Sequence, residues 1–485
     1  MPTVTFLNSG RQLSVQEDTI LLQAARQLGL PLAAPCGGNG TCGKCRVMVN
    51  GREVLACRTK VDADMVVELP RQAQANIMTF GEMAKLPVDP LQSGYLLAFD
   101  IGTTTVVCYL LSPEGQELAA ESMLNPQASF GADVISRIQR SLAGEMDALT
   151  KAIRSGMSSL IAKCCEKAGI KPSQVGVISV VGNPCMQQLF LGILPDNLAS
   201  IPFAPVLTSA EAESAAAIFP ECGSAVLLTI PDISGYVGAD TVGCVLSSGL
   251  CDAEETTLMV DIGTNGEMVL SHGGRMVACS TAAGPALEGA NITCGMGGSV
   301  GAMDHVWAEN GEIRYSVIGN CQTAGICGSG IIDAVAAALE LKMLNKRGRI
   351  LDEANICLSE NVYLTQEDIR QFQMAKGAIA AGIHLLCGHL GITAADIQRV
   401  ILAGAFGSYL NPENACRVGL LPRELAGKIT AAGNLAGVGA KMTALNKEKF
   451  AFTQELCRKI EFLELAQVPS FRKTFAQCML FSNLD

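Results

Sequence analysis

The chain has 485 residues, of which 49% are hydrophobic and 17% are charged, and its formal net charge is −11. This composition can supply two to four sizeable domain cores and excludes a mainly disordered protein. The negative charge argues against a nucleic-acid partner and against binding to an anionic membrane surface.

Neither a signal peptide nor a membrane-spanning segment is predicted. The first ten residues lack a basic start followed by an apolar core, and the longest candidate for a membrane span, Ala324–Leu341, is interrupted by Asp333 and Glu340. The 20 cysteines are spread through apolar segments, as is typical of buried thiols in a reducing compartment. We therefore expect a soluble cytoplasmic protein.

Residues 1–70 are predicted to form a small β-rich domain with one helix. Helical spacing covers Ile20–Leu28, with Asp18 or Thr19 as the expected N-cap. The dipeptide Asn50-Gly51 predicts a two-residue hairpin turn. The expected strands are Val4–Leu7, Gln12–Val15, Arg46–Val49 and Glu53–Leu55.

Four cysteines of this domain have the spacing C-x5-C-x2-C-x11-C, namely Cys36, Cys42, Cys45 and Cys57. Plant-type ferredoxins bind a [2Fe–2S] cluster with C-x4-C-x2-C and a distant fourth cysteine. The glycines between them allow a loop to wrap a cluster and point N–H groups at its sulfurs; they are Gly37, Gly38, Gly40 and Gly43. A structural zinc site is the alternative, although zinc motifs usually pair two C-x2-C units. The segment resembles the β-grasp ferredoxin domain.

The proline-containing segment 71–93 is predicted to be a linker with one short helical stretch, Asn76–Lys85. Beyond it the chain contains an internal repeat. Leu96–Thr105 and Leu258–Glu267 each read as a strand followed by an Asp-Ile-Gly-Thr turn, and each is followed by two more strands. Two such copies predict two similar halves.

The residue types in both turns suit phosphate binding. Gly102 and Gly263 allow backbone N–H groups to approach phosphate oxygens, and four neighbouring side chains add hydrogen-bond donors: Thr103, Thr104, Thr264 and Asn265. The strand-end carboxylates of Asp100 and Asp261 are suited to hold Mg²⁺ through water or to position an attacking water. Glu267 and Asp240 are further candidates for that metal or water shell.

Two glycine-rich segments follow later in the chain. Gly325–Gly330 precedes a predicted helix at Ile331–Leu344, whose N-terminal N–H groups could face a nucleotide. Arg399–Gly407 is an apolar strand that runs into a glycine turn. Either segment could instead be a packing glycine cluster. The residues expected beside an adenosine are Gly328, Ser329, Gly404, Ala405 and Phe406.

With the connecting element Val180–Pro184, these segments resemble the actin, heat-shock ATPase and sugar-kinase superfamily. That resemblance covers residues 94–485. It implies a duplicated RNase-H-like ATPase domain, with subdomains at residues 94–255 and 256–485 and ATP in the cleft between them.

A ferredoxin domain ahead of this ATPase resembles the reductive activators of corrinoid-dependent methyltransferases and of the corrinoid iron–sulfur protein. Residues 182–192, 231–240, 283–289 and 471–481 also resemble that family. The resemblance implies an α/β and α+β multidomain enzyme with a [2Fe–2S] cluster, ATP and Mg²⁺. It would pass an electron from a low-potential donor to a Co(II) corrinoid protein and restore Co(I). A homodimer is compatible with the sequence.

Larger members of that family insert a further domain between the linker and the first phosphate loop, whereas here Gly94 leads almost directly into Asp-Ile-Gly-Thr. Two other functions remain open at this stage. The ATPase fold also phosphorylates small molecules, which would make the chain a kinase with a fused redox domain. A nucleotide-gated redox sensor without catalytic turnover is the other alternative.

Overall fold

The computed structural model describes the chain except residues 29, 31, 33, 35–37, 39, 41–44, 70–78, 80, 82, 352 and 482–485. The chain divides into two compact units. The first unit comprises residues 1–72, 87–238 and 443–447, and the second comprises residues 73–86, 239–442 and 448–485. Within the described residues, no helix is long and apolar enough to cross a membrane.

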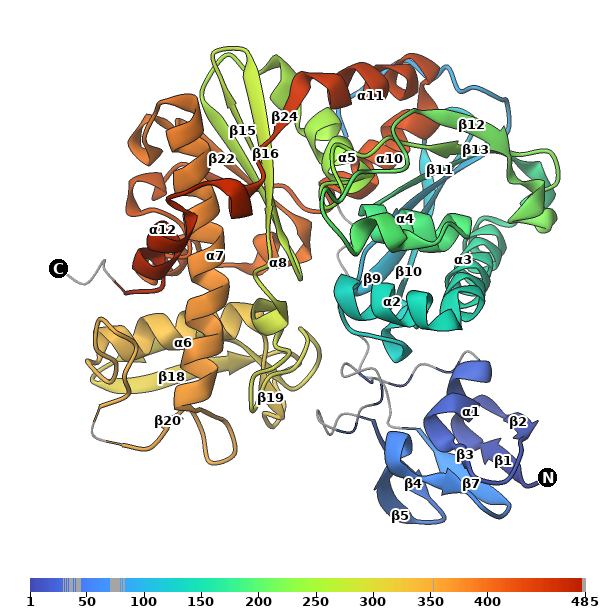
Figure 1. The fold of residues 1–485 in the computed structure, drawn as a ribbon, viewed down its shortest axis with the longest axis horizontal. Coiled ribbons are helices and arrows are strands. Elements are labelled where there is room, and N and C mark those ends of the chain that lie inside the picture. The colour runs from blue at the N-terminus through green and yellow to red at the C-terminus, as the bar shows by residue number, and fades with distance from the viewer. Residues whose placement is uncertain are drawn as a thin grey trace. The chain divides into compact units, whose positions relative to one another are not determined.

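The N-terminal part of the first unit is a five-stranded sheet in the order β2-β1-β7-β4-β5, with helix α1 (Leu21–Gln27) beside it (Figure 1). The pair β1–β7 is parallel and the other neighbours are antiparallel. Val4, Phe6, Leu21 and Leu22 are buried in one shared core. The strands are β1 (Thr3–Phe6), β2 (Arg11–Ser14), β4 (Arg46–Val49), β5 (Arg52–Leu55) and β7 (Met65–Glu68).

The predicted hairpin turn is confirmed, because Asn50 and Gly51 have φ angles of 47° and 80° and join β4 to β5. The predicted N-cap of α1 at Asp18 or Thr19 is wrong. The helix begins after Ile20, whose side chain makes no capping hydrogen bond. Thr19–Ile20 forms the short strand β3, which pairs with β6 (Lys60–Val61). Pairing with a segment 40 residues away thus takes the place of a local cap.

The rest of the first unit is built on a six-stranded sheet in the order β10-β9-β8-β11-β13-β12. Helices α2 (Val134–Arg140), α3 (Met146–Ala168) and α4 (Pro184–Leu191) accompany it (Figure 1). The strands are β8 (Tyr95–Ile101), β9 (Thr105–Leu111), β10 (Glu117–Leu124), β11 (Val175–Gly182), β12 (Glu211–Ser214) and β13 (Val226–Thr229).

The second unit repeats this topology. Its sheet has the order β23-β22-β14-β15-β16-β24, so that β16-β15-β14-β22-β23 matches β10-β9-β8-β11-β13 strand for strand. In both series the first three strands are antiparallel neighbours and the last two pairings are parallel. The strands are β14 (Thr257–Ile262), β15 (Gly266–His272), β16 (Arg275–Thr281), β22 (Arg399–Ala403), β23 (Ile429–Ala431) and β24 (Ile460–Phe462). The predicted duplication is therefore confirmed.

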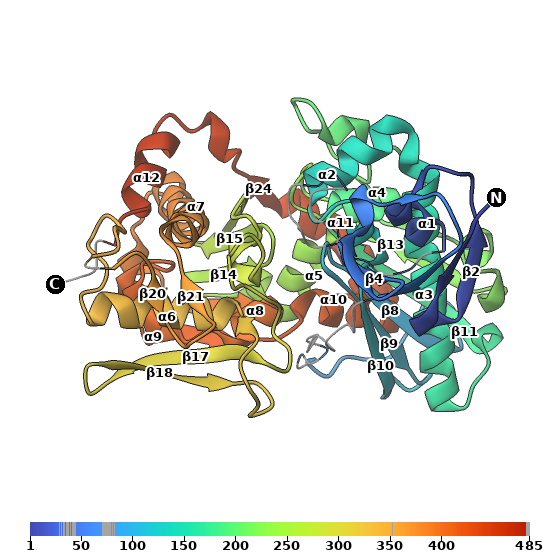
Figure 2. The same ribbon diagram turned by 90° about the horizontal axis from the view of Figure 1, so that it is seen from below.

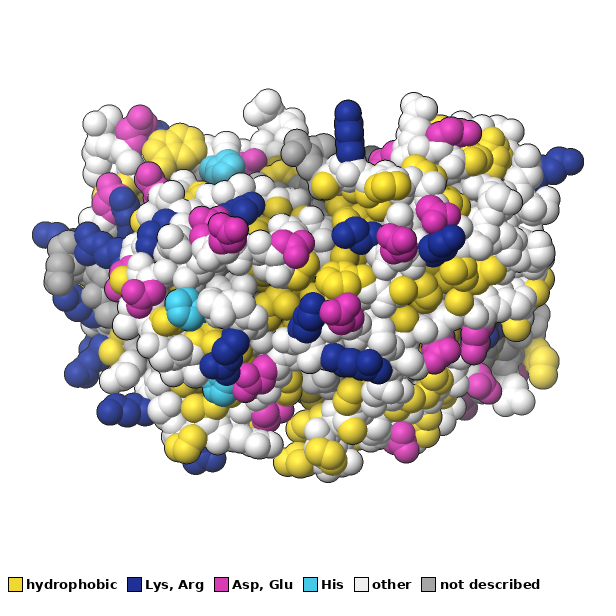
Figure 3. Space-filling model, turned by 90° about the horizontal axis from the view of Figure 1, so that it is seen from above, with side chains coloured by type: hydrophobic (Ala, Val, Ile, Leu, Met, Phe, Trp, Pro, Cys, Tyr) yellow, Lys and Arg dark blue, Asp and Glu magenta, His cyan; other side chains and the backbone are white. Residues whose placement is uncertain are grey.

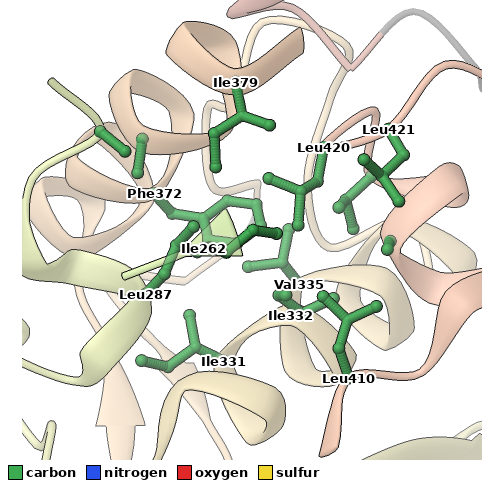
Figure 4. Packing of buried hydrophobic residues seen from close by; sticks show 14 of the residues in the cluster. Ile262, Leu287, Ile331, Ile332, Val335, Phe372, Ile379, Leu410, Leu420 and Leu421 are labelled. Carbon is green, nitrogen blue, oxygen red and sulfur yellow. The ribbon is translucent and has the colours of Figure 1, made fainter. Parts of the chain in front are cut away.

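Helices α6 (Gly328–Glu340) and α7 (Gln366–Leu390) contribute to the hydrophobic core of the second unit. In Figure 4, Ile331, Ile332 and Val335 of α6 point toward Phe372 and Ile379 of α7, and all five belong to one buried cluster. Figure 2 shows α6 beside the hairpin of β17 (Ala302–Glu309) and β18 (Glu312–Val317). Helix α6 begins three residues earlier than the predicted Ile331.

Within the predicted helix at Asn76–Lys85, residues 76–78, 80 and 82 lie outside the described residues, and residues 79, 81 and 83–85 are not helical. The face drawn in Figure 3 carries basic and acidic side chains interspersed with apolar ones.

Candidate functional site

The β4–β5 hairpin brings two of the four predicted cluster ligands to one place. Arg46 pairs with Leu55 in the ladder, and the next residue along, Ala56, donates its N–H to the Cys45 carbonyl at 2.8 Å. Cys45 is buried, with 1% of its surface exposed, and Cys57 follows directly after Ala56. Antiparallel pairing therefore joins two cysteines that are twelve positions apart in the sequence.

Two glycines of the loop before Cys45, Gly38 and Gly40, are described by the structure. Gly38 and Gly40 have φ angles of 98° and 78°, in the region that favours glycine. A Cβ on Gly40 would lie 2.4 Å from Nε of Arg58, and Arg58 donates from Nη2 to the Gly40 carbonyl at 3.0 Å. Arg58 thus ties the loop to the segment that carries Cys57.

These residues fit a [2Fe–2S] group in ligand type and in loop geometry, since thiolates and a glycine loop are what such a cluster requires. Cys36 and Cys42, with Gly37 and Gly43, lie outside the described residues. Among the described residues, no three His, Cys, Asp or Glu side chains are grouped so as to hold a metal ion. The complete ligand set therefore stays a prediction.

The first phosphate loop follows β8 and is closed by a hydrogen bond from the Gly102 N–H to the Thr105 carbonyl at 2.8 Å. Asn125, which follows strand β10, also stabilises this loop through two hydrogen bonds. Its Nδ2 donates to the Gly102 carbonyl at 2.8 Å, and its N–H donates to the Thr104 carbonyl at 2.8 Å. Asp100 stands at the end of β8, half-buried, and Thr104 is exposed.

Thr103 is held by two further residues. Arg137 of α2, fully buried, donates from Nη2 to the Thr103 carbonyl at 2.5 Å and from Nε to the Gly131 carbonyl at 3.0 Å. Asn183 donates from Nδ2 to Oγ1 of Thr103 at 3.0 Å. The loop's carbonyls and the Thr103 hydroxyl are thereby fixed before any ligand arrives.

Replacing Arg137 by Met should destabilise the first unit. The substitution leaves the Thr103 and Gly131 carbonyls buried without the donors that Arg137 supplies, at about 1–3 kcal/mol each. We expect the free energy of unfolding to fall by about 2–4 kcal/mol, measured by urea denaturation. The same change at exposed Arg370 of α7 is the control and should shift the midpoint little. Equal midpoints for both variants would contradict this role.

The second phosphate loop follows β14 and is closed by a hydrogen bond from the Gly263 N–H to the Asn265 carbonyl at 2.9 Å. Thr264 donates from Oγ1 to Oε2 of Glu288 at 3.0 Å. Glu288 therefore fixes the Thr264 hydroxyl as Asn183 fixes the Thr103 hydroxyl. Glu288 accepts its hydrogen bond, whereas Asn183 donates one.

Asp261 at the end of β14 lies against Gly404. The strands β14 and β22 pair Asp261 with Ala403, and a Cβ on Gly404 would lie 2.5 Å from Oδ1 of Asp261. The φ angle of Gly404 is 81°, a second reason why glycine is needed there. Cys244 of α5 (Ala239–Ser248) donates from Sγ to Oδ2 of Asp261 at 3.8 Å.

Burial raises the pKa of Asp261 to about 6, although the Cys244 thiol partly offsets that rise. The pKa of Glu267 is raised well above its ordinary value by burial and then by repulsion from Asp240 and Asp261. Asp240 and Asp261 therefore both repel the Glu267 carboxylate, and a cation would relieve this repulsion. Mg²⁺ usually takes one or two carboxylates together with water and phosphate oxygens, which fits carboxylates that do not form a closed metal cage.

This environment predicts a pH dependence. Asp261 has a pKa of about 6, so it is mostly ionised at pH 7 and mostly neutral at about pH 5. The affinity for a Mg²⁺–ATP analogue should then fall about tenfold as the pH is lowered from 7 to 5. Titration calorimetry measures this, and Asp261→Asn should flatten the profile. An affinity that does not change over this range would contradict the assignment.

The residues expected beside adenosine lie on two elements of the second unit. Gly328 and Ser329 are buried at the start of α6, and the Ser329 hydroxyl donates to the Asp304 carbonyl at 2.9 Å. Gly404 begins α8 (Gly404–Tyr409). The side chains of Ala405 and Phe406 lie outside the described residues.

Asn125, Arg137, Asn183 and Glu288 were not predicted as site residues. Asn183 and Glu288 lie in segments with family resemblance, and that could have pointed to them. Asn125 precedes a proline, as an N-cap does, and its side chain accepts from the Gln127 N–H. The sequence gives no indication of the role of Arg137. A buried arginine that binds backbone carbonyls cannot be distinguished in sequence from an exposed arginine on a helix.

Three family descriptions match the chain: "2Fe-2S iron-sulfur cluster binding domain" over residues 4–71, "RACo middle region" over residues 95–253, and "C-terminal domain of RACo the ASKHA domain" over residues 255–485. The protein named "Corrinoid activation enzyme RamQ" from Eubacterium limosum is 32% identical over 97% of this chain and 98% of its own length. This chain belongs to the family of corrinoid reductive activators.

A second relative, "[Co(II) methylated amine-specific corrinoid protein] reductase" from Methanosarcina barkeri, is 28% identical over 76% of this chain and 73% of its own length. The solved structure titled "Reductive activator for corrinoid,iron-sulfur protein" matches with a TM-score of 0.75 and 27% identity, covering 100% of this chain and 99% of that one. The family resemblance and the fold class predicted from sequence are both confirmed.

The domain matches also confirm a ferredoxin-type [2Fe–2S] domain followed by an ATP-binding domain of the actin and sugar-kinase class. The description "RACo middle region" covers residues 95–253, which begin at the first phosphate loop. The segment that carries this description in corrinoid reductive activators is therefore present in this chain.

Proposed function

We propose that this chain is an ATP-dependent reductive activator that delivers one electron to the Co(II) corrinoid of a methyltransferase-system protein and so restores Co(I). The observation that supports this most is that a [2Fe–2S]-type domain and a duplicated phosphate-loop fold lie in one polypeptide. The named relatives are a corrinoid activation enzyme and a Co(II) corrinoid protein reductase. The electron would come from a low-potential donor in the cytoplasm.

We assign the cluster to Cys36, Cys42, Cys45 and Cys57. A [2Fe–2S] cluster, when bound, supplies transfer of single electrons. Cys45 is held by the buried hairpin, and Arg58 fixes the loop next to Cys57.

We assign phosphate binding to both Asp-Ile-Gly-Thr loops. Asn183 and Glu288 would orient the threonine hydroxyls, and Asp100 and Asp261 would hold Mg²⁺ or an attacking water with help from Glu267. The remaining phosphate and adenosine contacts are assigned to Gly102, Thr103, Thr104, Gly263, Thr264, Asn265, Gly328, Ser329, Gly404, Ala405 and Phe406.

A need for ATP follows from redox energetics. Plant-type ferredoxin clusters have potentials near about −400 mV. If the Co(II)/Co(I) couple lies about 200 mV lower, transfer of one electron costs about 5 kcal/mol. A nucleotide that binds one conformation about 10⁴-fold more tightly than the other supplies about that much.

The test is anaerobic Co(I) spectroscopy on a Co(II) corrinoid protein mixed with this protein, ATP and a low-potential reductant. Co(I) should appear only when ATP and reductant are both present, and the corrinoid protein should stimulate ATP hydrolysis. Co(I) formation that is indifferent to ATP would contradict the proposal. Transfer of labelled γ-phosphate to a metabolite would instead identify a kinase, and negligible ATP turnover with the reduced partners would identify a sensor.

A further inference from the structure

Arg26, at the end of α1 in the ferredoxin domain, contacts the ATPase part of the same unit. Its Nε donates to the Ser129 carbonyl at 2.7 Å, and its Nη2 donates to the same oxygen. Its guanidinium lies 5.1 Å from the centre of the Phe130 ring, and Nη1 lies 4.0 Å from Oε2 of Glu145. Only 9% of the Arg26 side chain is exposed. The Ser129 carbonyl, the Phe130 ring and the Glu145 carboxylate therefore form a specific binding site for the guanidinium.

Ser129 and Phe130 belong to segment 125–131, which also holds the first phosphate loop. At one end of this segment, Asn125 donates to the carbonyls of Gly102 and Thr104. At the other end, Arg137 bonds the carbonyls of both Gly131 and Thr103. Arg26 therefore binds the middle of a short segment whose two ends fix the phosphate loop.

Arg26 also borders the cluster loop. A Cβ built on Gly38 would lie 3.8 Å from Nη2 of Arg26 and 3.9 Å from Nη2 of Arg140. Arg140 in turn is paired through Nη1 with Glu145 at 3.1 Å. The same guanidinium thus lies between the loop that carries the cysteines and the segment that supports the phosphate loop.

We propose that Arg26 is a positioning residue that couples nucleotide binding at the first phosphate loop to the contact between the ferredoxin domain and segment 125–131. This inference rests on the proposed function of that loop. When Arg26 is bound to Ser129 and Phe130, segment 125–131 is held in the conformation that fixes Gly102–Thr104. This contact therefore favours nucleotide binding. By linkage, nucleotide must favour this contact by the same factor.

The test compares Arg26→Gln with wild type in the full, cluster-loaded chain. Arg26→Gln should weaken binding of a non-hydrolysable Mg²⁺–ATP analogue about fivefold or more. The cluster absorbance and electron paramagnetic resonance spectra should stay unchanged. Arg52→Gln in the exposed part of strand β5 is the matched control and should bind the analogue as wild type does.

Hydrogen exchange separates coupling from a merely structural role. In wild type, the analogue should slow amide exchange in α1, which belongs to the ferredoxin domain, and Arg26→Gln should remove this response. Arg26→Lys keeps the charge but loses the two-nitrogen fork, so it should restore part of the affinity. A structural role would lower cluster content or stability without removing the response of α1 to nucleotide.

Wild-type affinity in Arg26→Gln, or no nucleotide response of α1 in wild type, would overturn the coupling while leaving the proposed function in place. Failure of wild type to bind the analogue at all would overturn both. An affinity loss of the same size in Arg52→Gln would also overturn the role of Arg26, because it would then reflect the domain's overall charge.

Discussion

Replacing Cys45 by Ala should abolish ATP-dependent Co(I) formation and bleach the protein. Cys45 is 1% exposed and its carbonyl accepts a hydrogen bond from the N–H of Ala56 next to Cys57, so the substitution removes one thiolate of the proposed ligand set. With three ligands the site should lose most of its iron. Iron content, visible absorbance and the rate of Co(I) formation are the measurements, and the rate should fall to that of the reductant by itself.

The same variant should still bind the Mg²⁺–ATP analogue, because both phosphate loops lie in other parts of the chain. Cys321→Ala, at an exposed cysteine of the second unit, is the control and should keep its iron and its activity. Normal cluster assembly in Cys45→Ala would show that the ligand assignment is wrong. Loss of nucleotide binding together with the cluster would point to misfolding if the circular dichroism spectrum also changed, and otherwise to loss of the proposed Arg26 contact.

Asp261→Asn should have the second large effect. The amide has nearly the volume of the carboxyl group that fits beside Gly404. It removes the negative charge that the Asp261 carboxylate carries above about pH 6. Loss of this charge from a proposed Mg²⁺ site should lower the ATP-dependent rate of Co(I) formation about 100-fold or more. The cluster spectrum should be unchanged, because the cysteines lie in the first unit.

Although Asp261→Asn should lower the activity, it should not lower the stability of the protein. Burial disfavours the charged form of Asp261, and Asp261 is one of two carboxylates whose repulsion adds to the raised pKa of Glu267. The neutral amide should therefore leave the ligand-free protein as stable as wild type or more stable. Thermal unfolding in the absence of nucleotide checks this. Asp62→Asn, at an exposed position, is the matched control and should change neither quantity. Full activity in Asp261→Asn would remove Asp261 from the proposed site.

The family assignment and the site assignment have different support. Similarity over nearly the whole chain, 97% of it in one relative, establishes the family. The individual ligands are proposals that depend on local geometry, such as the approach of Gly404 to Asp261 and the bond between Thr264 and Glu288. The two variants above address the cluster and the nucleotide site separately, so either assignment can fail without the other.

Local patterns were sufficient to predict the features that depend on neighbours in sequence. Asn50-Gly51 adopts the positive φ angles that a two-residue hairpin requires, and Gly38 and Gly40 do so in the cluster loop. The two Asp-Ile-Gly-Thr copies predicted the duplicated sheets for the same reason. Each copy brings its own strand, turn and following strands, and this local unit folds in the same way twice.

Tertiary structure decided the features that depend on distant partners. The start of α1 is set by pairing of Thr19–Ile20 with Lys60–Val61 and not by a capping side chain. Arg137 and Arg26 are ordinary helical arginines in sequence, yet one binds Thr103 and the other binds Ser129, 34 and 103 positions away. A buried guanidinium must find acceptors wherever the fold places them. The ferredoxin-type domain and the ATP-binding domain could therefore be predicted from the sequence, whereas the contacts of Arg26 and Arg137 could not.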